Sequence, residues 1–119
     1  MSRRFVVIDG LPGSGKTRLA RRLSPVLGLP VIDKDDLLEQ LFDRKGVGDA
    51  ASRRQLSREA DRLVQAAAVD STDGAILVSL WHRHGMPADS GTPVEWLAQL
   101  SASIVTVLCT CDARLAASR

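Results

Sequence analysis

A glycine-rich segment near the amino terminus has the residue types and spacing needed to bind phosphate. Residues 10–17 read Gly-Leu-Pro-Gly-Ser-Gly-Lys-Thr and directly follow an apolar run at residues 5–8. The glycines let the backbone turn tightly, so that successive N–H groups point at phosphate oxygens. Lys16 adds a positive charge for the β- and γ-phosphates, and the Thr17 hydroxyl can ligate Mg²⁺ at the start of the following helix. We therefore predict a P-loop that holds a nucleoside triphosphate through Gly10, Leu11, Pro12, Gly13, Ser14, Gly15, Lys16, Thr17 and Arg18.

Three acidic residues follow the second predicted strand, a short apolar pair at residues 31–32. A carboxylate near the γ-phosphate can hold Mg²⁺ or its waters, or it can accept the proton of an acceptor hydroxyl. If the chain is still extended here, Asp33 and Asp35 share one face, with one carboxylate toward the metal and the other toward the acceptor. The structural alternative is that Asp35 or Asp36 only caps the next helix, and for Asp36 we expect capping to be the sole role.

A third polar segment, residues 79–84, follows the third predicted strand. In an open α/β sheet the ligand lies beyond the carboxyl ends of the strands, so this segment should meet the other two there. Trp81 could stack on an acceptor ring or simply cover the sheet edge. His82 and His84 flank Arg83, and we expect them to be polar loop residues, although a metal role or contact with the acceptor is an alternative.

Strand and helix patterns alternate along the whole chain, which predicts an α/β fold with a parallel sheet covered by helices on both faces. Strands are expected at residues 5–8, 31–32, 75–80 and 104–109. Helices are expected after Lys16, from about Leu37, from a capping box at Ser52 and Gln55, from a second capping box at residues 92–95 to about Ser101, and from Asp112. The side chains expected to be buried on the first and third helices are Leu19, Ala20, Leu23, Val26, Leu27, Leu56, Ala60, Leu63, Val64 and Ala67.

Composition limits the classes of protein that fit. The chain has 119 residues, 45% hydrophobic and 25% charged residues, and a net charge of +2. This charge is too small to indicate nucleic-acid binding, and no apolar run approaches the roughly 20 residues of a membrane span. A strand begins almost at once after Met1, so we expect no signal peptide and a cytoplasmic protein. Cys109 and Cys111 are expected to be reduced thiols in the core, with a metal pair as the alternative.

The motifs together resemble those of the small P-loop kinases, a group that includes shikimate kinase, gluconate kinase, chloramphenicol phosphotransferase and zeta-toxin-like ATP-binding proteins. The segments that carry the resemblance are residues 10–17, the Asp-Lys-Asp-Asp at residues 33–36, and Cys-Asp-Ala-Arg-Leu at residues 111–115 with Arg119. The resemblance implies a three-layer P-loop NTPase fold with strand order 2-3-1-4. It also implies that ATP and Mg²⁺ are bound and that the γ-phosphoryl group is transferred to a hydroxyl of a small molecule.

Roles for individual residues follow from the same resemblance. Asp35 best matches the acid that orients or deprotonates the acceptor, and Asp33 would hold the metal with Thr17. Arg119 would be the first phosphate-clamping arginine of the lid, and Arg114 is a weaker candidate. Many relatives carry an acid at the end of the third strand, and this chain does not. Residues 1–119 are expected to form a single domain without the lid, fifth strand and last helix of the relatives, which would bind nucleotide but transfer phosphoryl groups poorly.

Two other functions share part of this pattern. A nucleotide-binding regulatory or assembly module would use the P-loop to stabilise one conformation without phosphorylating an acceptor. A switch GTPase fits less well, because the guanine-reading Asn-Lys-x-Asp motif is absent. The sequence leaves the acceptor and the oligomeric state open.

Overall fold

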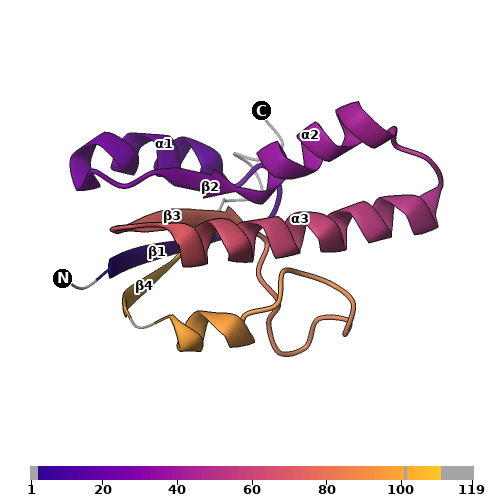
Figure 1. Cartoon of the computed structure of the whole chain (residues 1–119). Helices are drawn as coiled ribbons and strands as arrows, with labels where there is room; N and C mark the ends of the chain where they lie inside the picture. The colour runs from indigo at the N-terminus through magenta and orange to yellow at the C-terminus, as the bar shows by residue number, and fades with distance from the viewer. Residues whose placement is uncertain (1–2, 101, 111–119) are drawn as a thin grey trace.

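The computed structural model describes residues 3–100 and 102–110, which form one parallel four-stranded sheet with helices around it (Figure 1). The strands are β1 (Arg3–Asp9), β2 (Val31–Asp33), β3 (Gly74–Ser79) and β4 (Ala102–Leu108), in the order β2-β3-β1-β4. The fold class and the strand order implied by the resemblance are confirmed. The parallel register pairs Asp9 of β1 with Ser79 of β3 and with Leu108 of β4, so the carboxyl ends of these strands lie level with one another.

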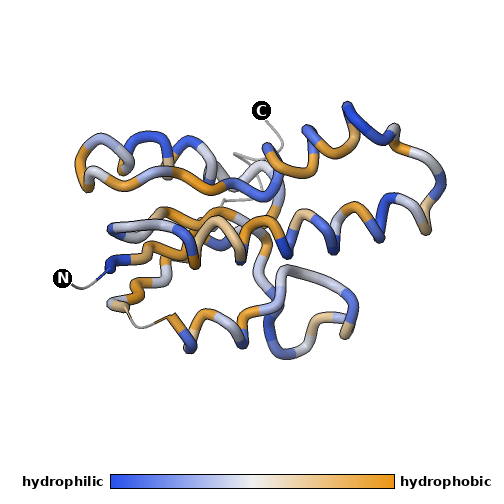
Figure 2. The backbone as a smooth tube through the Cα atoms, in the orientation of Figure 1, coloured by the Kyte–Doolittle hydropathy of each residue, from blue (hydrophilic) through white to orange (hydrophobic). Residues whose placement is uncertain are grey.

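The helices are α1 (Lys16–Leu27), α2 (Lys34–Lys45), α3 (Ala50–Asp70) and a short 3₁₀ helix, η1 (Glu95–Gln99). Successive side chains of a strand point to opposite faces, and the two apolar clusters of the sheet follow this alternation. Ile8 and Ile76 pack on the α1 side with Ala20. Phe5 and Leu77 belong to the cluster on the other face, which α3 and η1 cover. Figure 2 shows β1 and β3 as largely apolar, as strands buried on both faces should be.

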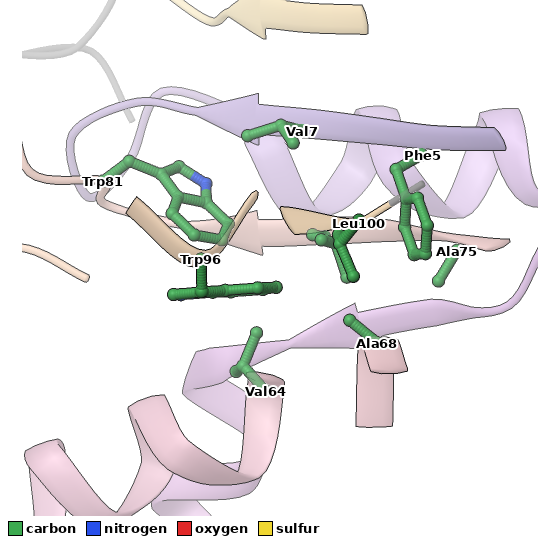
Figure 3. Close-up of a cluster of buried hydrophobic side chains, with 9 residues drawn as sticks. Phe5, Val7, Val64, Ala68, Ala75, Trp81, Trp96 and Leu100 are labelled. Atoms are coloured by element: carbon green, nitrogen blue, oxygen red, sulfur yellow. The ribbon is translucent and has the colours of Figure 1, made fainter. Parts of the chain in front are cut away.

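The cluster under α3 and η1 contains both tryptophans (Figure 3). Their ring centroids lie 6.0 Å apart with the planes inclined by 48°, within the range of favourable aromatic pairs. Trp81 is 2% exposed, and its Nε1–H donates to the Ile8 carbonyl oxygen at 3.1 Å. The indole is therefore a buried anchor between β1 and the segment after β3, and the expectation that it could stack on an acceptor is wrong.

Several local expectations are also wrong. The N-cap of α3 is Asp49 rather than Ser52, and the backbone N–H that Ser52 donates to it lowers the pKa of the Asp49 carboxyl. The Thr92 hydroxyl caps no helix, because it contacts Asp61, and only the short η1 forms in that region. Val26, expected to be buried on the first helix, is 78% exposed.

The buried face of α3 and the end of β4 differ from expectation as well. On α3, Leu63 and Ala67 are exposed and Ala68 is buried, because the apolar buried stripe runs at four-residue spacing through Leu56, Ala60, Val64 and Ala68. β4 ends at Leu108, so Cys109 follows the strand. Cys111 and the helix expected from Asp112 lie outside the described residues. Within the described part, no helix has the length and apolar character needed to cross a membrane.

Gly74 provides a test of how tightly β1 and β3 approach each other. Its φ is +106°, and a Cβ there would overlap the backbone of Arg4. Gly74→Ala is therefore expected to lower the free energy of unfolding by roughly 2 kcal/mol or more, because positive-φ strain and overlap in a packed sheet act together. Gly85→Ala is the matched control: its φ is +91° but a Cβ would enter open space, so only strain of about 1 kcal/mol is expected. Urea unfolding measures both, and equal losses would contradict this account.

Candidate nucleotide-binding site

The predicted P-loop connects the end of β1 to the start of α1. Gly13 and Gly15 have φ values of +82° and +87°, which side chains with a Cβ rarely adopt. Gly10 does not have a positive φ, so its backbone conformation does not require glycine, contrary to expectation. It is needed for space, since a Cβ there would lie 2.9 Å from the Cys109 carbonyl oxygen. These glycines let a turn form directly against the end of β4.

The loop leaves polar groups suited to an anion at the start of α1. Gly15 is the N-cap of α1 and has no side chain to cap it, so the positive end of the helix dipole has no side-chain acceptor. Lys16, the first residue of the helix, is only 7% exposed. Within the described part of the chain, Ser14 Oγ is a buried side-chain atom that has no hydrogen-bond partner. A buried cation and an unpaired hydroxyl beside a helix N-terminus suit a bound phosphate group.

Thr17 and Asp33, the two residues expected to hold a metal, lie in direct contact. Thr17 Oγ1 donates to Asp33 Oδ2 at 2.7 Å, and Asp33 is 3% exposed. The other oxygen, Asp33 Oδ1, accepts the backbone N–H of Asp35 at 2.9 Å, which makes Asp33 the N-cap of α2. A hydroxyl and a carboxylate oxygen are ligands that Mg²⁺ accepts, so this pair fits the ion.

Asp35 occupies a different position from the one that an extended chain would give it. Because α2 begins at Lys34, Asp35 is in the first turn of a helix and does not share a strand face with Asp33. It is exposed and lines a pocket of about 360 Å³ together with Lys16 and Thr17. The other lining residues are Pro12, Gly13, Gly15 and Arg18. The geometry thus separates the two carboxylates: Asp33 is buried against Thr17, and Asp35 opens onto the pocket.

Asp9 is a site residue that the sequence reasoning missed. Its Oδ1 accepts two backbone N–H groups, from Gly10 and from Trp81, each at 2.9 Å. Its Oδ2 lies 3.6 Å from Arg83 Nε. The carboxylate therefore ties the first residue of the P-loop to the segment after β3. The available signal was an acid at the end of an apolar strand, immediately before the first glycine.

Arg83 lines a second pocket on the β4 side of the P-loop, with a volume of about 380 Å³. Its other lining residues are Leu11, Pro12, Gly13, Ser14, Leu108, Cys109 and Thr110. His82 Nδ1 lies 2.7 Å from the Ser90 carbonyl oxygen, a contact within the same loop. Arg114 and Arg119, the expected lid arginines, lie outside the described residues.

A buried polar cluster lies beside the site and was also missed. Asp61 of α3 is 6% exposed, and its Oδ1 is 2.7 Å from Lys34 Nζ and 2.8 Å from Thr92 Oγ1. Its Oδ2 is 3.3 Å from Arg58 Nη1. Ser79, at the carboxyl end of β3, shares a hydrogen bond of 2.5 Å with Thr92. Where many small P-loop kinases have an acid, this chain has a hydroxyl that leads to Asp61.

The chain is similar to a protein family and to several shikimate kinases. A family model described as an AAA domain matches residues 5–119. Shikimate kinase from Mycobacterium ulcerans is 38% identical over 72 residues, which are 59% of this chain and 39% of the relative. The matched segments span less than half the length of these curated relatives, 30% of one shikimate kinase and 39% of another.

Two solved structures share the fold. A protein from Chloroflexus aurantiacus matches 100% of this chain and 64% of its own, with a TM-score of 0.80 and 22% identity. Shikimate kinase from Bacteroides thetaiotaomicron matches 90% of this chain and 57% of its own, with a TM-score of 0.54 and 20% identity. At identities of 22% and 20%, these structural similarities support the fold alone.

Proposed function

The chain belongs to the AAA domain family, and from this premise we propose that it binds ATP with Mg²⁺ and transfers the γ-phosphoryl group to a hydroxyl of a small molecule. The observation that carries the proposal is the convergence of Lys16, Thr17 and Asp35 on one pocket, with Asp33 hydrogen-bonded to Thr17. Phosphoryl transfer asks a protein mainly for positioning and for compensation of charge, and this set supplies both. The similarity to shikimate kinases makes a polyhydroxylated acid the first acceptor to test.

Each residue in this proposal has one role. The backbone of the P-loop and the N-terminus of α1 bind the phosphates, and Lys16 compensates their charge. Thr17 and Asp33 would hold Mg²⁺, which, when bound, neutralises charge on the phosphate oxygens. Asp35 is exposed in the same pocket, where it can orient the acceptor hydroxyl and take its proton.

Asp33→Asn tests the metal role without removing the helix cap. Asparagine keeps an oxygen that can accept the Asp35 N–H, but it loses the negative charge. We expect the gain in ATP affinity that Mg²⁺ gives to fall roughly 10- to 100-fold, the range for groups that hold a metal or orient its ligands. ATP affinity in EDTA should change little. Titration calorimetry in Mg²⁺ and in EDTA measures both, and an unchanged response to Mg²⁺ would remove Asp33 from the metal site.

The function itself is tested by following ATP consumption with a panel of acceptors. The panel contains shikimate, gluconate, hydroxylated antibiotics and nucleoside sugars, and each is compared with ATP alone. We expect one chemical class to raise consumption and to yield a phosphorylated product by mass spectrometry. Consumption that no acceptor changes, despite tight ATP binding, would favour a nucleotide-binding regulatory module. A chain that binds no ATP in the presence of Mg²⁺ would contradict the whole proposal.

A further inference from the structure

Asp61 connects three segments that surround the candidate site. It contacts Lys34, the first residue of α2, and Thr92, whose hydroxyl also meets Ser79 at the end of β3. It also contacts Arg58, which donates in addition to the carbonyl oxygens of Asp89 and Gly91 in the loop after β3. One buried carboxylate thus joins α2, β3 and the loop to α3.

The link to the metal pair passes through Lys34. Asp33 and Lys34 are adjacent, and Asp33 is both the N-cap of α2 and the acceptor for Thr17. The Lys34 side chain is 13% exposed and that of Asp61 is 7% exposed, so this ion pair is shielded from water. By holding the Lys34 side chain, Asp61 would fix the position of the first turn of α2. Because Asp33 is the N-cap of that helix, the direction of its carboxylate would be fixed as well.

Stability alone is a weak reason for such a cluster. Removing charges from water is costly, and apolar side chains of similar volume often serve a fold equally well. The same two helices carry a second ion pair at the far end of α2, between Lys45 and Glu59, at 3.1 Å with 50% and 30% exposure. That exposed pair joins α2 to α3 without contacting the site, so it provides a matched comparison.

We infer that Asp61 is a positioning residue for the metal-binding pair: through Lys34 it holds the start of α2 so that Asp33 stays directed at Thr17. The inference rests on the proposed function, because it concerns the binding of Mg²⁺ with ATP at that pair. Asp61 contacts neither nucleotide nor metal in this account. Its loss should therefore reduce the contribution of Mg²⁺ selectively and leave the P-loop able to bind ATP.

The test measures ATP affinity by titration calorimetry with Mg²⁺ and with EDTA, and the readout is the ratio of the two affinities. Asp61→Asn is expected to lower this ratio roughly three- to tenfold, less than loss of a residue that directly orients a metal ligand. Lys34→Met should lower the ratio similarly, and it leaves Asp61 paired with Arg58 and Thr92. Lys34→Arg keeps a cation that can reach Asp61 and should retain most of the ratio.

Glu59→Gln is the control and should leave the ratio unchanged. Thermal unfolding by circular dichroism is recorded for every variant, and if Asp61→Asn does not fold, Lys34→Met decides the question. The inference is overturned if folded variants keep the wild-type ratio, or if affinities in Mg²⁺ and EDTA fall by the same factor, as a merely structural role predicts. A wild-type chain without any Mg²⁺-dependent ATP binding would instead contradict the proposed function.

Discussion

Lys16→Met is expected to lower the rate of phosphoryl transfer about a thousandfold or more, equivalent to roughly 4 kcal/mol of lost transition-state stabilisation. The Lys16 side chain carries the cation that the P-loop provides at the start of α1, and Lys16 is only 7% exposed. ATP affinity should fall as well, because in the proposed site this charge would contact the phosphates before and during transfer. Calorimetry with Mg²⁺ and ATP measures the binding, and single-turnover assays with an identified acceptor measure the transfer.

The same variant separates function from folding. Methionine is similar to lysine in length and removes the cost of burying a charge, so the unfolding midpoint of Lys16→Met should be equal to that of the wild type or higher. Lys45→Met is the matched control, since the Lys45 side chain is 50% exposed at the far end of α2. It should leave ATP binding intact. ATP binding by Lys16→Met at the wild-type affinity would show that the Lys16 ammonium group does not contribute to binding of the triphosphate.

Asp35→Ala is expected to reduce transfer roughly 10²- to 10⁴-fold, the contribution typical of a positioned general base. ATP affinity should stay within about twofold of the wild type, because in the proposed site Asp33 and Thr17 would still hold the metal and Lys16 would still contact the phosphates. The two effects separate a kinase from a regulatory nucleotide-binding module, in which no transfer exists to be lost. Initial rates at saturating ATP measure the first effect, and calorimetry measures the second.

Asp36→Ala is the control for Asp35→Ala. Both carboxylates are exposed in the first turn of α2, so both substitutions remove the same favourable interaction with the helix dipole. Asp35 lines the pocket beside Lys16, and Asp36 is not among the residues that line it. Transfer rates that fall equally in the two variants would assign the effect to the helix start and not to a base at residue 35.

Features set by neighbouring residues were predictable from the sequence. The P-loop, the strands and the end of α1 at Gly28 depend on local glycines and on apolar runs, and the structure has them within a few residues of the predicted positions. The sequence also placed Asp33 and Thr17 together, because parallel strands bring their carboxyl ends to the same edge of a sheet.

Features that depend on distant partners were not predictable. Thr92 followed by proline and glutamate reads as a helix cap, but a buried carboxylate 31 residues away competes for its hydroxyl. Asp61 belongs to no local motif, and its burial is compensated by ion pairs with Lys34 of α2 and with Arg58. Asp9 was overlooked for the same reason, since its second backbone donor, Trp81, is 72 residues away.

The way in which Trp81 is anchored has a spectroscopic consequence. The chain has two tryptophans and no tyrosine, and both indoles lie together in one buried cluster. The backbone N–H of Trp81 shares an acceptor oxygen with Gly10, the first residue of the phosphate-binding turn. Tryptophan emission from this chain therefore originates close to that turn, and we expect it to change when a ligand binds there, without any added label.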